Sequence, residues 1–313
     1  MQRRDRRRVK RRLKGPVKWG IAIVVTAVAI ASGYSWVVLS KTVSLEAPQV
    51  VSEVKSSKPL PNVYSQAFVL LDARNNSVVA QKGGEDKIYP ASLVKMMTVI
   101  LAIEESRDLQ ERVTLSADIF SYLFTNDASV AGFSSGEVVP VIDLLYGAIL
   151  PSGGDAALGL AEHVSGSETA FVGLMNRKAE ALGMKYTHFT NASGLHDANQ
   201  YSTVSDLVIL MQYALQNNTF KQVISTPEYT TYEADAHEEG LSFSSTFFNM
   251  ADNRLAKGKF IGGKTGTTDE AGLNLASAVE VNGTTYILVS AGAKDDGNKN
   301  QYEDAITIYN AYL

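Results

Sequence analysis

The sequence predicts an α+β domain in which strands from both ends of the chain form one antiparallel sheet. Three observations support this fold class. Short β-favouring runs open the domain, the middle of the chain has apolar residues at spacings of three and four, and the Asn282-Gly283 pair near the end separates two apolar runs. The first pattern is typical of strands, the second of helices and the third of a β-hairpin. We therefore expect a helix-covered antiparallel sheet with a helical subdomain.

The elements are expected in the following order. Residues 66–73 and 77–81 are two strands, because both are apolar and a polar Arg74-Asn75-Asn76 turn joins them. Helices follow wherever apolar residues recur with helical spacing. The expected helices are 92–105, 142–150, 154–164, 168–182 and 203–216, the late strands are 272–281 and 284–292, and the closing helix is 302–313.

Residues 1–63 differ from the rest of the chain. Residues 1–18 carry ten Lys or Arg and are expected to be a basic cytoplasmic tail. Residues 19–39 contain no charged side chain, so they can form a transmembrane anchor, and residues 40–63 have the composition of a linker. The positive charge on the N-terminal side predicts a single-pass cell-membrane protein whose domain, residues 64–313, is extracytoplasmic. A cleaved signal peptide is the alternative, although its apolar region is usually shorter.

Composition excludes several classes of function. Outside the tail the chain has 19 Lys or Arg and 32 Asp or Glu, and such an acidic domain is a poor partner for nucleic acid. The absence of Cys excludes thiol nucleophiles, disulfides and Cys-ligated zinc. The four histidines form no His-Glu-x-x-His pair, so neither a metal site nor a cofactor is predicted.

The segment around Ser92 carries the first chemical signal. Pro90 precedes a long apolar-periodic run and marks a helix start, so Ser92 lies in the first turn and Lys95 lies on the same face. A lysine whose pKa is lowered can remove the proton of a serine hydroxyl. Ser-x-x-Lys alone is weak evidence, because a capping serine beside a surface lysine gives the same pattern.

Two further motifs strengthen this signal by their order along the chain. Ser152-Gly153-Gly154 follows an apolar helix, and Lys264-Thr265-Gly266-Thr267 precedes the C-terminal hairpin. Singly, the first could cap a helix and the second could be a polar turn. Ser134, within Gly-x-Ser-x-Gly, is interpreted as a loop residue, because neither an apolar strand before it nor a helix directly after it is predicted.

Together the three motifs resemble those of serine D-alanyl-D-alanine carboxypeptidases, the low-molecular-mass penicillin-binding proteins of peptidase family S11. The resemblance runs from about residue 63 to residue 313, and also includes Phe189-Thr190-Asn191-Ala192-Ser193-Gly194-Leu195. It implies a β-lactamase/transpeptidase-like fold. It further implies a peptidoglycan stem peptide ending in D-Ala-D-Ala as substrate and β-lactam antibiotics as covalent inhibitors.

The resemblance also implies roles for individual residues. Ser92 would attack the carbonyl between the two D-alanines, Lys95 would take its proton, and Ser152 with Lys264 would pass a proton to the leaving group. Thr265 would contact the terminal carboxylate, and Gly154 and Gly266 belong to the substrate-binding motifs. The backbone N–H groups of Ser92 and Thr267 would form the oxyanion hole.

The chain departs from the family pattern at two places. The second motif usually reads Ser-x-Asn, whereas Gly154 stands here, so an amide that would steady Lys95 and the substrate carbonyl is missing. The family also tends to place an arginine near the C-terminus to bind the carboxylate. This chain offers Lys294 or Lys299 instead, and lysine does not form the same bidentate fork.

Three functions stay open at this point. The first is a carboxypeptidase that trims stem pentapeptides, with transpeptidation to an amine as a variant of the same chemistry. The second is a β-lactamase, although no Glu-x-x-Leu-Asn segment lies between Ser152 and Lys264. The third is a non-catalytic peptidoglycan-binding homologue, which Gly154 and the absent arginine suggest.

Overall fold

A computed structural model of the chain describes residues 58–232, 236–252 and 254–313. The predicted basic tail, transmembrane anchor and most of the linker lie outside these residues. None of the helices in the described ranges combines the length and the apolar character that crossing a bilayer requires.

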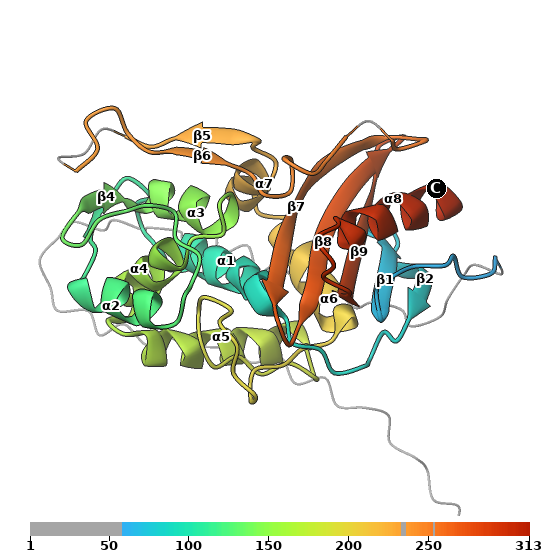
Figure 1. Cartoon of the computed structure of the whole chain (residues 1–313), viewed down its shortest axis with the longest axis horizontal. Helices are drawn as coiled ribbons and strands as arrows, with labels where there is room; N and C mark the ends of the chain where they lie inside the picture. The colour runs from blue at the N-terminus through green and yellow to red at the C-terminus, as the bar shows by residue number, and fades with distance from the viewer. Residues whose placement is uncertain (1–57, 233–235, 253) are drawn as a thin grey trace, which may run out of the picture. The chain divides into compact units, whose positions relative to one another are not determined.

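A five-stranded antiparallel sheet joins the two ends of the domain (Figure 1). Its order is β2-β1-β9-β8-β7, and β1 from the N-terminal part pairs with β9 from the C-terminal part, with Leu70 opposite Leu288. The predicted sheet is therefore confirmed. Its strands are β1 (Ala67–Asp72), β2 (Ser77–Lys82), β7 (Lys259–Thr268), β8 (Gly272–Val281) and β9 (Thr284–Ala293).

Alternating side chains of β1 enter two different cores, because successive strand residues point to opposite faces. Phe68 and Leu70 pack with Tyr309 in the core beneath α8 (Asn300–Tyr312). Val69 belongs to the larger core on the other face, where α6 (Val204–Ala214) contacts the sheet. Both faces of the sheet are therefore covered by helices, as Figure 1 shows.

The helical block between the strands contains the expected helices and several elements that were not predicted. The predicted helix 142–150 is α3 (Val141–Ile149), 154–164 is α4 (Gly154–Ser165), and 168–182 is α5 (Glu168–Leu182). The three-residue strands and the seven-residue α7 were missed, because so few residues carry almost no periodic signal. Helix α2 is as long as α3, but only two of its side chains, Ile119 and Leu123, are buried, so its apolar pattern is weak. The missed elements are α2 (Ala117–Thr125), α7 (Asn218–Ile224) and the strands β3 (Arg112–Thr114), β4 (Val138–Pro140), β5 (Glu228–Thr230) and β6 (Ser242–Ser244).

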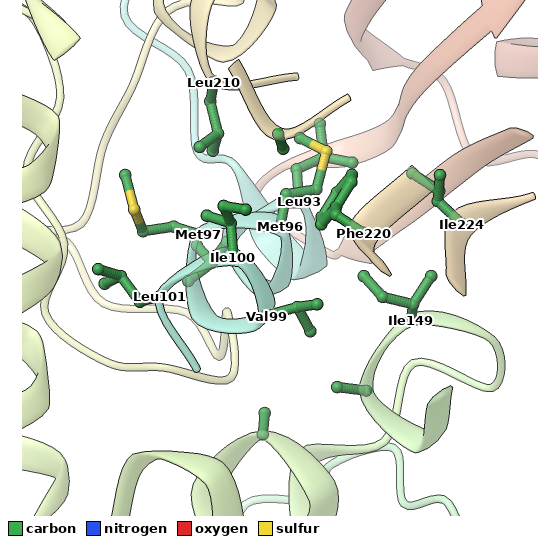
Figure 2. Packing of buried hydrophobic residues seen from close by; sticks show 14 of the residues in the cluster. Leu93, Met96, Met97, Val99, Ile100, Leu101, Ile149, Leu210, Phe220 and Ile224 are labelled. Atoms are coloured by element: carbon green, nitrogen blue, oxygen red, sulfur yellow. The ribbon is translucent and has the colours of Figure 1, made fainter. Parts of the chain in front are cut away.

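One helix lies at the centre of the larger core. The predicted helix 92–105 begins as a 3₁₀ turn, η1 (Ala91–Val94), and continues as α1 (Lys95–Glu105). Figure 2 shows Met96, Val99 and Ile100 of α1 among side chains from other helices, and all three are fully buried. A helix that is apolar on all sides must be surrounded by protein. The residues at its start are therefore held rigidly.

Strand β7 passes directly against η1 at Gly266. A Cβ added at Gly266 would lie 3.1 Å from the backbone nitrogen of Ser92 and 3.2 Å from the carbonyl oxygen of Pro90. Both atoms belong to the backbone around η1, and at these distances a side chain fits only if the backbone shifts. Glycine therefore favours the close approach of the edge strand to the start of α1.

We expect Gly266→Ala to lower the free energy of unfolding by about 1–3 kcal/mol, because the added methyl group overpacks this contact. Urea denaturation measures the change. Gly173→Ala is the matched control, since a Cβ at Gly173 in α5 meets only the guanidinium of Arg177, at an ordinary 3.4 Å. That variant should be as stable as the wild type or more stable by about 0.5–1 kcal/mol. Equal stability of the two variants would contradict the proposed crowding.

Candidate active site

Ser92 and Lys95 face each other at the start of α1. The Lys95 Nζ donates a hydrogen bond to the Ser92 Oγ at 3.0 Å, as the three-residue spacing predicts. Ala91, directly before Ser92, has a φ of +48°, a backbone conformation that a non-glycine residue rarely adopts. Such strain is often found where a tight turn positions a functional side chain.

The ammonium group of Lys95 is buried, with 2% of the residue exposed. Burial lowers the pKa of Lys95 to about 7, and the negative charge of Asp155 opposes this shift only in part. A large fraction of Lys95 is therefore neutral near pH 7. Since a neutral amine beside a hydroxyl can accept its proton, Lys95 has the chemistry of a general base for Ser92.

A second serine and lysine pair comes from distant parts of the chain. The Lys264 Nζ donates to the Ser152 Oγ at 2.8 Å and to the carbonyl oxygen of Thr265 at 2.8 Å. Lys264 is fully buried on β7, and Ser152 has a φ of +67° on the loop between α3 and α4. Burial and the nearby positive charge of Lys95 lower the pKa of Lys264 well below its usual value. The fold thus brings the two lysines close together.

A cavity of about 370 Å³ opens beside the first pair. Of the predicted site residues, Ser92, Lys95, Gly154 and Thr267 line it. Ser152 and Lys264 are buried and do not line this cavity, although they bond to each other. The three motifs therefore meet beside one cavity, and Ser92 and the largely buried Lys95 are among the residues that line it.

Gly266 and Thr265 of the third motif do not line the cavity and contact other parts of the chain. Gly266 is pressed against the backbone at Ser92, and the Thr265 hydroxyl forms a 2.8 Å hydrogen bond with the Thr246 hydroxyl. The Thr246 N–H also donates to the carbonyl oxygen of Leu150, just before Ser152. Thr246 therefore links the second and third motifs. The sequence analysis missed it, because an isolated threonine outside a motif carries no signal.

The segment after α5 holds Lys95 from another side. The Lys95 Nζ donates to the carbonyl oxygen of Ser193 at 2.5 Å. Gly194 has a φ of +83°, and a Cβ there would lie 2.2 Å from the carbonyl oxygen of Ala91. The Asn191 side chain folds this turn by accepting the Gly194 N–H at 2.7 Å. The motif containing Ser193 was noted in the sequence, but a backbone carbonyl as a lysine ligand was not predicted.

The second motif is anchored by a buried carboxylate. Asp155, which has no exposed surface, accepts hydrogen bonds from the backbone N–H groups of Ala131, Gly132 and Phe133 at 2.7–3.2 Å. Beside it, the Gly154 N–H donates to the carbonyl oxygen of Ser129 at 2.7 Å. The loop that precedes β4 is therefore fixed to the start of α4.

Lys294 and Lys299 were the candidates for the carboxylate-binding position. Neither lines the cavity, and Lys299 instead donates to the carbonyl oxygen of Asn249 at 3.3 Å. The described residues lining the cavity include no arginine. Ser134 lies in the loop between α2 and β4, as predicted.

Comparison with known proteins agrees with this geometry. Residues 53–295 match the family model of the D-alanyl-D-alanine carboxypeptidases, Peptidase S11. The chain belongs to this family. The family model covers all three motifs, so Ser92, Ser152 and Lys264 all lie within the matched range.

Individual relatives of this S11 member are similar over most of its length. The chain is 32% identical to D-alanyl-D-alanine carboxypeptidase DacA of Haemophilus influenzae over 81% of this chain and 64% of the relative. It is 33% identical to the D-alanyl-D-alanine carboxypeptidase of Streptomyces sp. K15 over 72% of this chain and 80% of the relative. The chain thus spans less than two thirds of the length of the Haemophilus protein.

Solved structures confirm the predicted fold class. The crystal structure of the Streptomyces K15 DD-transpeptidase superimposes with a TM-score of 0.73 at 28% identity. The match covers 82% of this chain and all of that one. The fold is therefore that of the DD-peptidases, with an antiparallel sheet and a helical block.

We expect the rate of Ser92 acylation by a fluorescent penicillin to fall about tenfold per pH unit below about pH 7. The reason is that protonated Lys95, whose pKa is about 7, cannot accept the serine proton. The measurement is the second-order labelling rate as a function of pH. Lys95→Arg, which stays protonated, is expected to label very slowly at every pH. An acid limb centred near pH 4 would exclude Lys95 as the base, and one near pH 10 would contradict the lowering of its pKa by burial.

We expect Gly154→Asn, which restores the usual family residue, to slow acylation at least tenfold. A Cβ at this position would lie 2.7 Å from Leu123 Cδ2 and 3.1 Å from the carbonyl oxygen of Ser129, so the side chain must displace the cavity wall. Labelling rates and thermal unfolding of the variant and the wild type give the comparison. Acylation as fast as in the wild type, or faster, would show that the wall accommodates the side chain.

Proposed function

We propose that this chain is a D-alanyl-D-alanine carboxypeptidase that removes the terminal D-alanine from peptidoglycan stem pentapeptides through an acyl-enzyme on Ser92. The observation that carries the proposal is the 3.0 Å hydrogen bond between Lys95 and Ser92 beside a second buried pair, Lys264 and Ser152. Its relatives in Haemophilus influenzae and Streptomyces sp. K15 are named D-alanyl-D-alanine carboxypeptidases, which supports the same reaction.

The acylation step follows from these contacts. The Ser92 Oγ attacks the carbonyl carbon between the two D-alanines while its proton passes to the Lys95 Nζ. The tetrahedral oxyanion lies at the backbone N–H groups of Ser92 and Thr267, and the contact of β7 with η1 at Gly266 supports this location. The C–N bond then breaks, and a proton from Lys95 reaches the leaving amine through Ser152 and Lys264.

Water completes the cycle by attacking the ester carbon of the acyl-enzyme. Lys95, neutral again once the proton has left with D-alanine, accepts a proton from this water. The ester C–O bond then breaks, and Lys95 returns the proton to the Ser92 Oγ with which it is in contact, so that the free serine is regenerated. An amine acceptor in place of water would make the reaction a transpeptidation, and the Streptomyces K15 neighbour is named a DD-transpeptidase. Release of D-alanine is common to both outcomes, whereas transfer to an added amine such as glycylglycine distinguishes them.

β-Lactam antibiotics are proposed as covalent inhibitors, because their strained amide would acylate the same serine. A β-lactamase would release the product rapidly, whereas a penicillin-binding carboxypeptidase keeps it. A non-catalytic homologue is disfavoured by the lowered pKa of Lys95 and by its contact with Ser92, which a purely structural lysine does not require.

The location of the enzyme is proposed from the sequence. Residues 19–39 would anchor the chain in the cell membrane, with the basic residues 1–18 in the cytoplasm and the catalytic domain outside, where the peptidoglycan substrate is found. Retention of the full chain in washed membranes, together with protease sensitivity of the domain on spheroplasts, would support this arrangement.

We expect Ser92→Ala to abolish both D-alanine release from diacetyl-L-Lys-D-Ala-D-Ala and covalent penicillin labelling, because no nucleophile remains. D-Alanine is measured enzymatically, and the labelled peptide is mapped by mass spectrometry. Ser134→Ala is the matched control, since Ser134 is a loop serine that does not line the cavity. It should keep wild-type release and labelling. Labelling of Ser92→Ala would show that another serine is the nucleophile.

A further inference from the structure

One wall of the cavity is made by a short segment that no motif includes. Asn126, Asp127, Ala128 and Ser129 line the cavity together with Ser92 and Lys95. Asn126 ends α2, and Asp127 follows with a φ of +48°, so the chain turns sharply at this point. The segment is therefore placed where a bound substrate would touch it.

This segment and the nearby Leu123 of α2 together occupy the space that a side chain at position 154 would need. A Cβ at Gly154 would lie 2.7 Å from Leu123 Cδ2 and 3.1 Å from the carbonyl oxygen of Ser129. The Gly154 N–H donates to the same carbonyl oxygen at 2.7 Å. The glycine of the second motif and the wall segment thus fit together as one unit.

The wall is anchored at both ends. Leu123, three residues before Asn126, is only 2% exposed and belongs to the larger core. After the segment, the Asp155 carboxylate accepts the N–H groups of Ala131 and Gly132 at 2.7 and 3.0 Å. Groups on this wall therefore hold a defined position relative to Ser92, which a binding group requires.

An amide at position 154 would have had two partners, the lysine and a substrate carbonyl. Lys95, the first partner, already has another hydrogen-bond partner in this chain, because the carbonyl oxygen of Ser193 accepts a hydrogen bond from the Lys95 Nζ at 2.5 Å. The substrate carbonyl, the second partner, requires a hydrogen-bond donor on the cavity wall. Asn126 carries the only carboxamide among the described residues that line the cavity. One hydrogen of its Nδ2 is donated to the carbonyl oxygen of Tyr122 at 2.8 Å, and the other hydrogen is left for a ligand.

We propose that Asn126 is a substrate-binding residue whose amide donates a hydrogen bond to the peptide carbonyl on the N-terminal side of the D-alanine that acylates Ser92. In this chain a side chain from the end of α2 thus replaces the amide that Gly154 lacks. The inference rests on the proposed function, because it concerns how the same acyl-enzyme is formed.

The test compares two β-lactams that differ in the group Asn126 would bind. Benzylpenicillin carries a side-chain amide carbonyl next to its ring, and 6-aminopenicillanic acid has a free amine there. Second-order acylation rates of Ser92 are measured with both for the wild type and Asn126→Ala. We expect the ratio of the two rates, benzylpenicillin over 6-aminopenicillanic acid, to fall about tenfold in the variant, the effect of one hydrogen bond.

Thr125→Ala is the matched control for the end of α2. The Thr125 hydroxyl donates to the carbonyl oxygen of Ser121 at 2.8 Å, a bond of the same kind as the one Asn126 makes to Tyr122. Thr125 does not line the cavity, so its replacement perturbs the helix end alone. It should leave the ratio of rates unchanged. Asn126→Asp, which keeps the size but loses the donor, should lower the ratio as alanine does.

Three outcomes would overturn the inference. An equal loss of rate with both β-lactams in Asn126→Ala would show that the residue only supports the fold, and no change in either rate would show that it makes no such bond. A fall of the ratio in Thr125→Ala would assign the effect to the helix end. If wild-type Ser92 is labelled by neither compound, the proposed function fails as well. If the wild type is labelled normally and only the ratio test fails, the proposed function stands without Asn126.

Discussion

The site depends on keeping the amine of Lys95 out of water. An ammonium group in the protein interior is strongly disfavoured, so burial favours the neutral form and turns a lysine into a base. Full burial of Lys95 is possible because the helix it begins is apolar on all sides and lies inside the larger core. The polar end of the side chain is then satisfied by two acceptors, the Ser92 hydroxyl and the Ser193 carbonyl. The reactivity of Ser92 thus depends on the packing of α1, because that packing buries Lys95.

Close backbone contacts hold the surrounding segments around this lysine. Gly194 and Gly266 both approach the backbone of η1 closely, since an added Cβ would lie 2.2 Å from the carbonyl oxygen of Ala91 at Gly194 and 3.1 Å from the backbone nitrogen of Ser92 at Gly266. The first brings the carbonyl of Ser193 to Lys95, and the second brings β7 with Lys264 beside the serine. Because both contacts lie between backbones, neither depends on a flexible side chain. Such contacts suit a site whose reacting atoms must be held within fractions of an ångström.

One of the two departures from the family pattern, Gly154 in the second motif, is explained by the loop that packs against it. Gly154 is closely matched to the segment that follows α2, since the carbonyl oxygen of Ser129 accepts a hydrogen bond from the Gly154 N–H. In this chain the glycine of the second motif and the neighbouring wall of the cavity are thus matched to each other. The missing arginine has no comparable replacement among Lys294 and Lys299, because neither lines the cavity. On β7, Thr265 bonds instead to Thr246, a neutral partner.

The sequence alone determined what depends on local spacing. Pro90, Ser92 and Lys95 lie within one helical turn, so their contact follows from helix geometry, and Asn282-Gly283 marks the turn between β8 and β9. The family resemblance implied that the three motifs act together, and only the tertiary structure decided the contacts by which distant groups meet. Ser193 lies 98 residues from Lys95, and Lys264 lies 112 residues from Ser152, so no periodic pattern relates them. Asn126 and Thr246 likewise carry no motif. Asn126 lines the cavity at the end of α2, and Thr246 bonds to Thr265 of β7. Contacts of this kind join segments far apart in the chain, so they are set by the packing of the whole domain and not by local residue order.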